Sequence, residues 1–266
     1  MICSVLSTWD HSIDTLSKLL HNSETQARAL TQTLIWGKRR LSRFASSREV
    51  QTTTYGTIPR DWQFPRIGKL ACEVSIRNTE DHDLPVLACS KYAGFVRSLE
   101  YFKKKVYSDD TSTYKVVPRG AFGFPSNHIE EGSIGYQDVC DAGLVSPIYC
   151  LFRTDGSVSD NYLYRLFKTD HYRQIFSAAT NSSVDRRGSL RWHEFSKLHV
   201  PLPSLKEQEA IVSILNAADA KTANLAKQLE NLRNQRVALM QQLLTGTRRM
   251  KVDTTDVPAA ADRMMR

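Results

Sequence analysis

The sequence shows no long apolar run, no pattern typical of a secretory signal in its first residues and no paired cysteine motifs. No stretch of the 266-residue chain approaches the roughly 18 uninterrupted apolar residues of a membrane span. The N-terminus has no basic stretch and reaches Asp10 early, which is atypical of a secretory signal. The five cysteines are odd in number, and none stands in a Cys-x-x-Cys pair. We therefore expect a reduced, cytoplasmic protein without a zinc knuckle or a membrane association.

Motifs of nucleotide-binding and hydrolytic enzymes are also missing. There is no P-loop and no G-x-G-x-x-G, and Gly120–Gly123 is too short to cradle a nucleotide. The Asn-Pro-Pro-Tyr and Asp-Pro-Pro-Tyr motifs of methyltransferases are absent. His193 and His199 are spaced six apart, which does not place two zinc ligands on one helical face. We expect no catalytic residue, no metal site and no cofactor.

The charged residues are unbalanced toward the basic side. Lysine and arginine number 36 against 28 aspartate and glutamate, giving a formal net charge of +8 and an isoelectric point near 9.3. Such an excess is typical of proteins that bind a polyanion such as nucleic acid, although ordinary basic proteins show it too. Apolar residues make up 41% and charged residues 24%, so the chain can bury a core.

A repeat joins the two ends of the sequence. Residues 5–40 align without a gap with residues 214–249, and 14 of the 36 positions are identical. The identities include aspartate, lysine, glutamine, glycine and paired arginine positions as well as leucines. Two unrelated helices would share only the apolar spacing, so we interpret the match as a duplication. Met1 aligns with Ala210, so the first copy begins partway into the repeat unit.

Both copies carry the heptad pattern of a coiled coil. Apolar residues recur every seven positions along two lines, which places them on one stripe of a helix. Neither copy contains proline, and Gly37 or Gly246 follows the last apolar pair, where a helix C-cap is expected. The pattern predicts two helices of about 36 residues that pair as an antiparallel coiled coil. The expected seam, which also serves partner subunits, contains Leu16, Leu20, Leu30, Leu34, Ile211, Leu215, Leu225, Leu229, Leu239 and Leu243.

The second helix has a clear predicted start. Two prolines precede Ser204, which is a favourable N-cap, and Glu207 stands three residues later. This spacing predicts a capping box, in which the two side chains satisfy each other's backbone N–H groups. Arginine pairs just past the helix ends would either compensate the helix dipole or contact phosphate or a partner subunit. These are Arg39, Arg40, Arg248 and Arg249.

Between the helices lies a segment rich in aromatic and β-branched residues. Its short runs predict strands at 85–89, 115–117, 133–136 and 148–152, and short helices at 161–168 and 172–176.

The pattern as a whole predicts an α+β fold, with a mixed α/β domain flanked by the two long helices. The expected boundaries are residues 1–45 for the first helical region, 46–55 for a linker, 56–203 for the central domain, 204–250 for the second helical region and 251–266 for a disordered tail.

The second repeat copy resembles the conserved helical region of type I restriction–modification specificity subunits. The stretch that carries this resemblance runs from Pro201-Leu-Pro203 through Asp219 to Arg249. The central segment is similar to the target recognition domain of that family. The similar stretches are Gly56–Trp62 and Ile67–Leu70 at its entry, Gly132–Gly135 and Gly143–Phe152 in its middle, and Ser182–Gly188 at its exit.

The resemblance implies a function and a set of partners. In that family each of two recognition domains reads half of a bipartite DNA site, while two helices set the gap and dock DNA methyltransferase (modification) subunits. With one such domain, this chain looks like a half-subunit. We expect either the C-terminal half of a longer product or a chain that pairs with a second copy or another half-subunit. A motor–nuclease (restriction) subunit would join through the complex, and the chain itself would be non-catalytic.

DNA reading requires cations for phosphates and polar or arginine side chains for base edges. The donor-rich loop at 181–191 is the best candidate to enter a groove. A solvated face is the alternative for each charge, and we expect it for Lys103–Lys105. Large aromatics mostly bury, so Tyr92 and Trp192 are expected to pack rather than contact bases. The candidate DNA-contacting residues are Lys91, Tyr92, Arg119, Ser183, Arg186, Arg187 and Arg191.

Two other functions remain open on the sequence. A helical hairpin could carry a globular domain that binds protein rather than DNA. A stand-alone nuclease could use the adjacent carboxylates of Asp109 and Asp110 near Lys115, although neighbouring acids in a turn are usually solvated.

Overall fold

The computed structural model describes residues 2–45, 47–79, 83–181 and 188–247. The chain divides into two compact units, Met1–Ala27 with Ala217–Arg266, and Arg28–Asn216. Each unit has its own packing. No helix in the described ranges has the length and apolarity that crossing a membrane requires. The tail expected at 251–266 lies outside the described residues.

Two long helices form where the repeat copies predict them. Helix α1 spans Ile2–Ile35 and helix α6 spans Leu205–Leu244. Gly37 and Gly246 follow them with φ of 63° and 72°, the left-handed conformation typical of a helix C-terminus. At the start of α6, the Ser204 hydroxyl accepts a hydrogen bond from the Glu207 backbone N–H at 3.3 Å, which confirms Ser204 as the N-cap.

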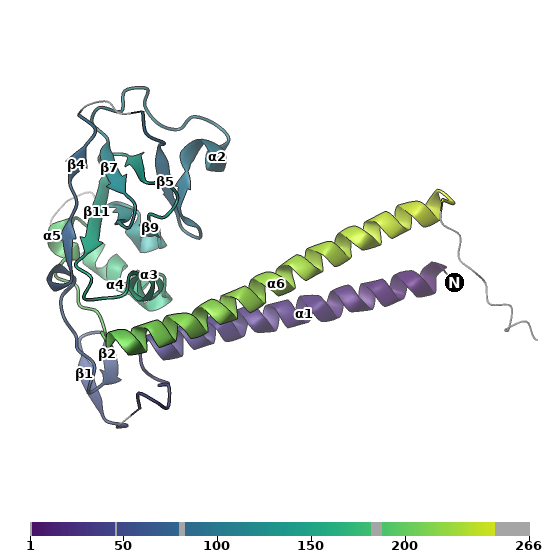
Figure 1. Cartoon of the computed structure of the whole chain (residues 1–266), viewed down its shortest axis with the longest axis horizontal. Helices are drawn as coiled ribbons and strands as arrows, with labels where there is room; N and C mark the ends of the chain where they lie inside the picture. Colours follow the sequence, from purple (N-terminus) through teal and green to yellow (C-terminus); the bar gives the residue numbers. More distant parts are fainter. Residues whose placement is uncertain (1, 46, 80–82, 182–187, 248–266) are drawn as a thin grey trace, which may run out of the picture. The chain divides into compact units, whose positions relative to one another are not determined.

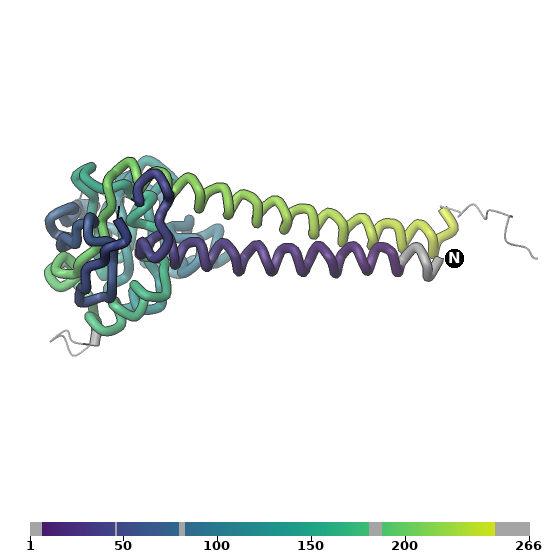
Figure 2. Tube along the Cα trace, turned by 90° about the horizontal axis from the view of Figure 1, so that it is seen from below, coloured from purple at the N-terminus to yellow at the C-terminus, as the bar shows by residue number. Residues whose placement is uncertain are grey.

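In the first unit, α1 and α6 pack side by side and run antiparallel (Figures 1 and 2). Asp10 Oδ1 lies 2.7 Å from Arg236 Nε, and Ser23 Oγ lies 2.9 Å from Thr222 Oγ1. Residue numbers therefore rise along one helix as they fall along the other. The predicted antiparallel helix pair is confirmed.

Polar residues interrupt the apolar seam of this helix pair. Ser23 and Thr222 occupy heptad positions that would otherwise continue the two apolar lines, and Ser23 is only 6% exposed. The Thr222 hydroxyl donates to the Ala218 carbonyl at 3.0 Å, which leaves its oxygen as the acceptor for Ser23. A polar pair at such a position fixes the register of a coiled coil at some cost in stability.

Replacing Thr222 with valine should destabilise the first unit by about 1–2 kcal/mol, because the buried Ser23 hydroxyl loses its partner across the seam. The double variant S23A/T222V removes both hydroxyls and should recover most of that loss. A double-mutant cycle measured by urea denaturation checks this. The control is Ser12→Ala, whose exposed hydroxyl bonds only within α1. A double variant no more stable than T222V would contradict the assigned pair.

The second unit contains a β-rich domain in which every strand pair is antiparallel. Its sheets have the strand orders β1-β2, β10-β7-β4, β3-β11-β8-β9 and β5-β6. The strands are β1 (Val50–Thr53), β2 (Gly56–Pro59), β3 (Ala71–Glu73), β4 (Ile76–Arg77), β5 (Leu87–Ser90), β6 (Gly94–Arg97), β7 (Lys115–Pro118), β8 (Phe122–Pro125), β9 (Gly135–Tyr136), β10 (Ala142–Val145) and β11 (Tyr149–Thr154). The helices are η1 (Ile67–Lys69), α2 (Ser98–Phe102), η2 (Ile129–Glu131), α3 (Asp160–Phe167), α4 (Asp170–Asn181) and α5 (Trp192–Phe195).

Stacked aromatic rings fill the core of this domain. Phe152 of β11 stacks on Phe122 of β8, with 5.0 Å between ring centroids and 7° between planes. Phe167 of α3 and Phe195 of α5 each lie against Phe152, at 6.3 and 5.1 Å. All four rings are fully buried. The core therefore joins the four-stranded sheet to the helices that follow it in sequence.

The observed elements agree with most of the predicted ones. All four predicted strand runs overlap observed strands (β5, β7, β9 and β11), and both predicted short helices overlap α3 and α4. The segment 46–55, expected as a linker, contains β1, which pairs with β2 and was not predicted as a strand. None of the β1 residues is buried, because exposed and partly exposed residues alternate along the strand. Strand prediction depends on a pattern of apolar residues, and the mostly polar sequence of β1 does not provide one.

Candidate nucleic-acid interface

Arg40 is buried in an ion-pair network rather than held at a free helix end. Its Nε and Nη2 donate to the two carboxylate oxygens of Glu207 at 3.0 and 2.8 Å, and its Nη1 donates to Asp61 at 2.8 Å. Trp62 Nε1 also donates to Glu207, at 3.2 Å. The side chains of Arg40 and Glu207 are only 8% and 3% exposed. The hydrogen bonds to Glu207 raise the pKa of the Arg40 guanidinium.

This network corrects the predicted capping box and shows how Arg40 is engaged. Both Glu207 carboxylate oxygens are engaged by Arg40 and Trp62, so Glu207 does not close the predicted capping box with Ser204. Arg40 donates to the carboxylates of Glu207 and Asp61, and its side chain is only 8% exposed, so a phosphate has little access to it. Arg39, its neighbour, is exposed.

Further buried hydrogen bonds tie the central domain to the same helix ends. The Tyr162 hydroxyl of α3, fully buried, lies 3.2 Å from the Ile35 carbonyl and 3.0 Å from the Pro201 carbonyl. Gln208 of α6 accepts from the Ser159 backbone N–H at 2.8 Å. Within the second unit, the last turn of α1 and the first turns of α6 are thus fixed to the domain that they carry.

The turn between β5 and β6 projects Lys91 and Tyr92 away from the domain. Tyr92 is 84% exposed, so the expectation that its ring packs in the interior is wrong. The reason is its place at the tip of a hairpin, where residues point into solvent whatever their hydrophobicity. Lys91 Nζ lies 5.5 Å from the centroid of the Tyr92 ring, a cation–π contact. A cation and an aromatic ring are thus exposed together.

The other described candidates, Arg119 and Arg191, lie on different turns. Arg119, between β7 and β8, is half-exposed and pairs with Asp141 at 3.1 Å. Arg191 directly precedes α5 and lines an open pocket with Lys115 and Glu73. The structure therefore distributes the candidates over the β5–β6 turn, the β7–β8 turn and the segment before α5.

The loop that carried the strongest sequence expectation is outside the described residues in its central part. The last residues of this loop are well anchored: the Leu190 backbone N–H donates to the Ser126 carbonyl at 2.8 Å, and Leu190 is fully buried. Trp192 packs on Phe152 with 5.7 Å between centroids, which confirms its expected packing role. The candidates outside the described residues are Ser183, Arg186 and Arg187, together with the helix-end residues Arg248 and Arg249.

The acidic pair that suggested a nuclease is engaged locally. Asp109 pairs with Lys105, and Asp110 accepts from the Ser112 backbone N–H and hydroxyl at 2.9 and 2.6 Å. These hydrogen bonds lower the pKa of both carboxyl groups. Both acids are exposed, and neither faces a third metal ligand among the described residues, so the geometry gives the nuclease alternative no support. The neighbouring Lys103–Lys105 run is exposed, as expected.

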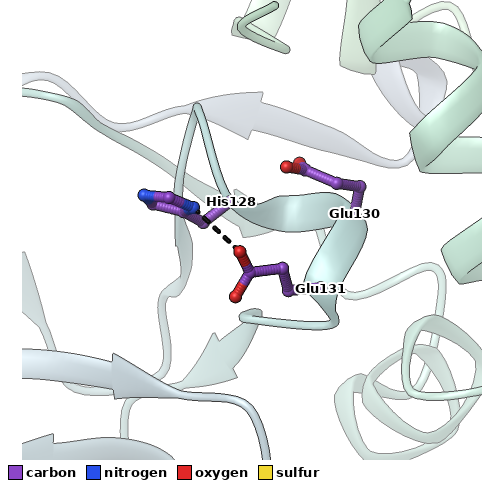
Figure 3. Close-up of side chains that lie close together, drawn as sticks. All are labelled: His128, Glu130 and Glu131. Carbon is purple, nitrogen blue, oxygen red and sulfur yellow. Dashed lines mark hydrogen bonds and ion pairs between the residues drawn. The ribbon is translucent and has the colours of Figure 1, made fainter.

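One cluster of possible metal ligands was not anticipated. His128, Glu130 and Glu131, around η2, bring one ligand atom each to within 4.8 Å of the others (Figure 3). His128 Nδ1 lies 3.1 Å from Glu131 Oε1, and both side chains are more than half exposed. The Glu130 carboxylate lies near that pair, and no hydrogen bond or ion pair joins it to either residue (Figure 3). A surface ion pair accounts for the His128 contact, so the cluster does not define a metal centre.

Within the second unit, the β-rich domain is fixed to the last turn of α1 and the first turns of α6. The family described as "Type I restriction modification DNA specificity domain" matches residues 93–234, more than half of the chain. The chain belongs to this family, which confirms the resemblance recognised in its sequence. Comparison with curated proteins gives no match.

Two solved structures share the fold. The HsdS subunit from Thermoanaerobacter tengcongensis matches with a TM-score of 0.53 at 14% identity, over 90% of this chain and 55% of that one. The S subunit of a type I restriction-modification system from M. genitalium matches with a TM-score of 0.51 at 15% identity, over 91% of this chain and 59% of that one. The chain therefore spans little more than half the length of these relatives.

Proposed function

We propose that this protein is the DNA-reading subunit of a type I restriction–modification complex and is not itself an enzyme. The family match carries the proposal, because it covers the central domain from the β5–β6 turn onward and most of α6. The net charge of +8 supports attraction to a polyanion. The central domain selects the DNA sequence, and partner subunits in the cytoplasm carry out methylation and cleavage.

The paired helices would act as the scaffold of that complex. They hold the central domain at one end of α1 and α6 within the second unit, through the Arg40–Glu207 network. We propose that the exposed faces of these helices dock the modification subunits, and that the restriction subunit joins through them. A second copy of this chain, or another half-subunit, would supply the second recognition domain under closed two-fold symmetry.

The proposed DNA contacts combine described turns with the loop at 182–187. Cations there would pair with phosphates and could read base edges. Arg119 would have to exchange Asp141 for a phosphate, so we expect it to contribute least. The proposed set is Lys91, Tyr92, Arg119, Ser183, Arg186, Arg187 and Arg191.

The first test is binding of the full chain, with and without a modification subunit, to duplex DNA at several salt concentrations. We expect affinity to fall as salt rises, because phosphate contacts release counterions. The variant R186A/R187A should lose about 10- to 100-fold in affinity for the preferred duplex. The control R43A/R48A removes the same charge from exposed residues near β1 and should change affinity less than about threefold.

Three outcomes would count against this assignment. Absence of DNA binding under all conditions, with assembly on the modification subunit intact, would favour a protein-binding module. An unchanged preference in R186A/R187A would remove the loop from the interface. Cleavage or methylation by the purified chain alone, lost on replacing Asp109 or Asp110, would favour the nuclease.

A further inference from the structure

The β5–β6 turn is unusual because its backbone is fixed while its aromatic side chain is not covered. Tyr92, at 84%, has the largest exposed fraction of the large hydrophobic side chains in the described residues. The hydroxyl of Ser90 accepts from the backbone N–H groups of Tyr92 and Ala93, both at 3.2 Å. These bonds close the turn locally and satisfy two donors that would otherwise face water.

The turn also packs closely against helix α3 of the same domain. Gly94 has φ of 69°, and a Cβ there would lie 2.7 Å from the Tyr164 hydroxyl of α3, so only glycine fits this approach. At Gly94 the backbone of the turn therefore lies directly against the Tyr164 hydroxyl of α3.

Lys168, at the end of α3, provides a second anchor. Its Nζ donates to the Lys91 carbonyl at 2.8 Å and to the Gly132 carbonyl at 3.0 Å, and lies 5.5 Å from the Tyr164 ring centroid. One ammonium group thus ties the tip of the β5–β6 hairpin to the segment after η2. Burial lowers the pKa of Lys168, so this placement costs solvation that the two carbonyls partly restore.

We propose that the Lys91–Tyr92 tip is a preorganised aromatic probe of duplex DNA, and that Lys168 is the residue that positions it. This inference rests on the proposed function. The Tyr92 ring stacks against a base at a partly unstacked step, and Lys91 binds the adjacent phosphate. A rigid tip loses little conformational freedom on binding, which is the advantage of holding the Lys91 carbonyl in place.

Duplex DNA fits this tip better than a protein surface does. The Lys91 ammonium lies over the Tyr92 ring, and an exposed ring accompanied by a cation matches a base accompanied by a phosphate. Protein hot spots, by contrast, place aromatic residues in water-excluding pockets with an apolar surround. The other exposed aromatic residues of the domain, Tyr101 and Phe102, pack on each other at 5.0 Å and leave less free ring surface.

The test uses the full chain with the modification subunit and a duplex selected from a random-sequence pool by the wild-type protein. Tyr92→Ala should lower affinity for that duplex about 5- to 100-fold, whereas Tyr92→Phe should stay within about threefold, because stacking needs the ring and not the hydroxyl. Permanganate footprinting should show a hyper-reactive thymine with the wild type and Y92F, and none with Y92A.

The positioning role of Lys168 is tested by coupling. Lys168→Met should lower affinity in the wild-type background and have no further effect in the Y92A background. A loss of equal size in both backgrounds would show that Lys168 acts elsewhere and would overturn its assignment. Circular dichroism of each variant before and after DNA addition verifies that the fold persists. If K168M does not fold, the exposed Tyr92 variants still decide the main inference.

The outcomes separate this inference from the proposed function. If the wild-type complex selects no duplex, the proposed function fails. If it selects one with salt-dependent affinity and Y92A binds that duplex equally well, the tip is not a probe while DNA reading stands. If Y92A instead weakens capture of the modification subunit, the tip is a protein contact and the inference is overturned.

Discussion

Replacing Arg40 with methionine should destabilise the second unit by about 3–5 kcal/mol, the cost of leaving a buried carboxylate without its cation. Arg40 bonds both oxygens of Glu207, whose side chain is only 3% exposed. Two N–H groups of Arg40 and the indole N–H of Trp62 donate to the Glu207 carboxylate. After the substitution, only the indole N–H would remain. Urea denaturation of the full chain, followed by tryptophan fluorescence, measures the change.

A rescue variant and an exposed pair complete that experiment. The double variant R40M/E207M should recover at least half of the loss, because apolar side chains of similar volume commonly replace a buried ion pair without penalty. Arg60→Met breaks the exposed Arg60–Glu49 pair, 72% and 64% exposed, and should cost less than about 1 kcal/mol. Equal losses in R40M and R60M would show that the network does not hold the helix ends to the domain.

The fold was largely predictable because its long helices repeat a simple pattern. A seven-residue apolar period requires a partner, and a duplicated helix in one chain supplies it, so the antiparallel pair followed from the sequence. The breaks in that pattern were less informative. Nothing in the sequence indicated that Ser23 and Thr222, 199 residues apart, would meet in the seam.

At the start of α6, a partner distant in sequence determines the hydrogen bonds of Glu207, and the local capping pattern does not. Ser204 and Glu207 have the spacing of a capping box, but only the Ser204 side chain caps the helix. Glu207 turns instead to Arg40, 167 residues away, because a buried carboxylate is stabilised more by a bidentate guanidinium than by one backbone N–H. This pairing depends on tertiary packing, which cannot be predicted from the residues next to Glu207 in the sequence.

The candidate interface was predictable in composition and not in geometry. Lys91, Arg119 and Arg191 were identifiable as cations, but their distribution over three turns depends on strand pairing. Tyr92 was named among the candidates but expected to pack, because large aromatic residues usually bury, whereas at the hairpin tip it is 84% exposed. Lys168 gave no signal at all, because its acceptors are backbone carbonyls and these are the same for every sequence.

Replacing Phe152 with alanine should destabilise the central domain by about 3–5 kcal/mol, since the removed ring leaves a cavity that rigid neighbours cannot fill. Phe152 is fully buried and stacks on Phe122 and Trp192, with centroids 5.0 and 5.7 Å away. Ile148, just before β11 and 43% exposed, is the control: I148A should cost less than about 1 kcal/mol in the same urea denaturation. Since Trp192 directly follows Arg191, F152A should also weaken DNA binding at temperatures where the domain remains folded. A loss of stability with unchanged DNA affinity would show that the segment before α5 keeps its place without this core.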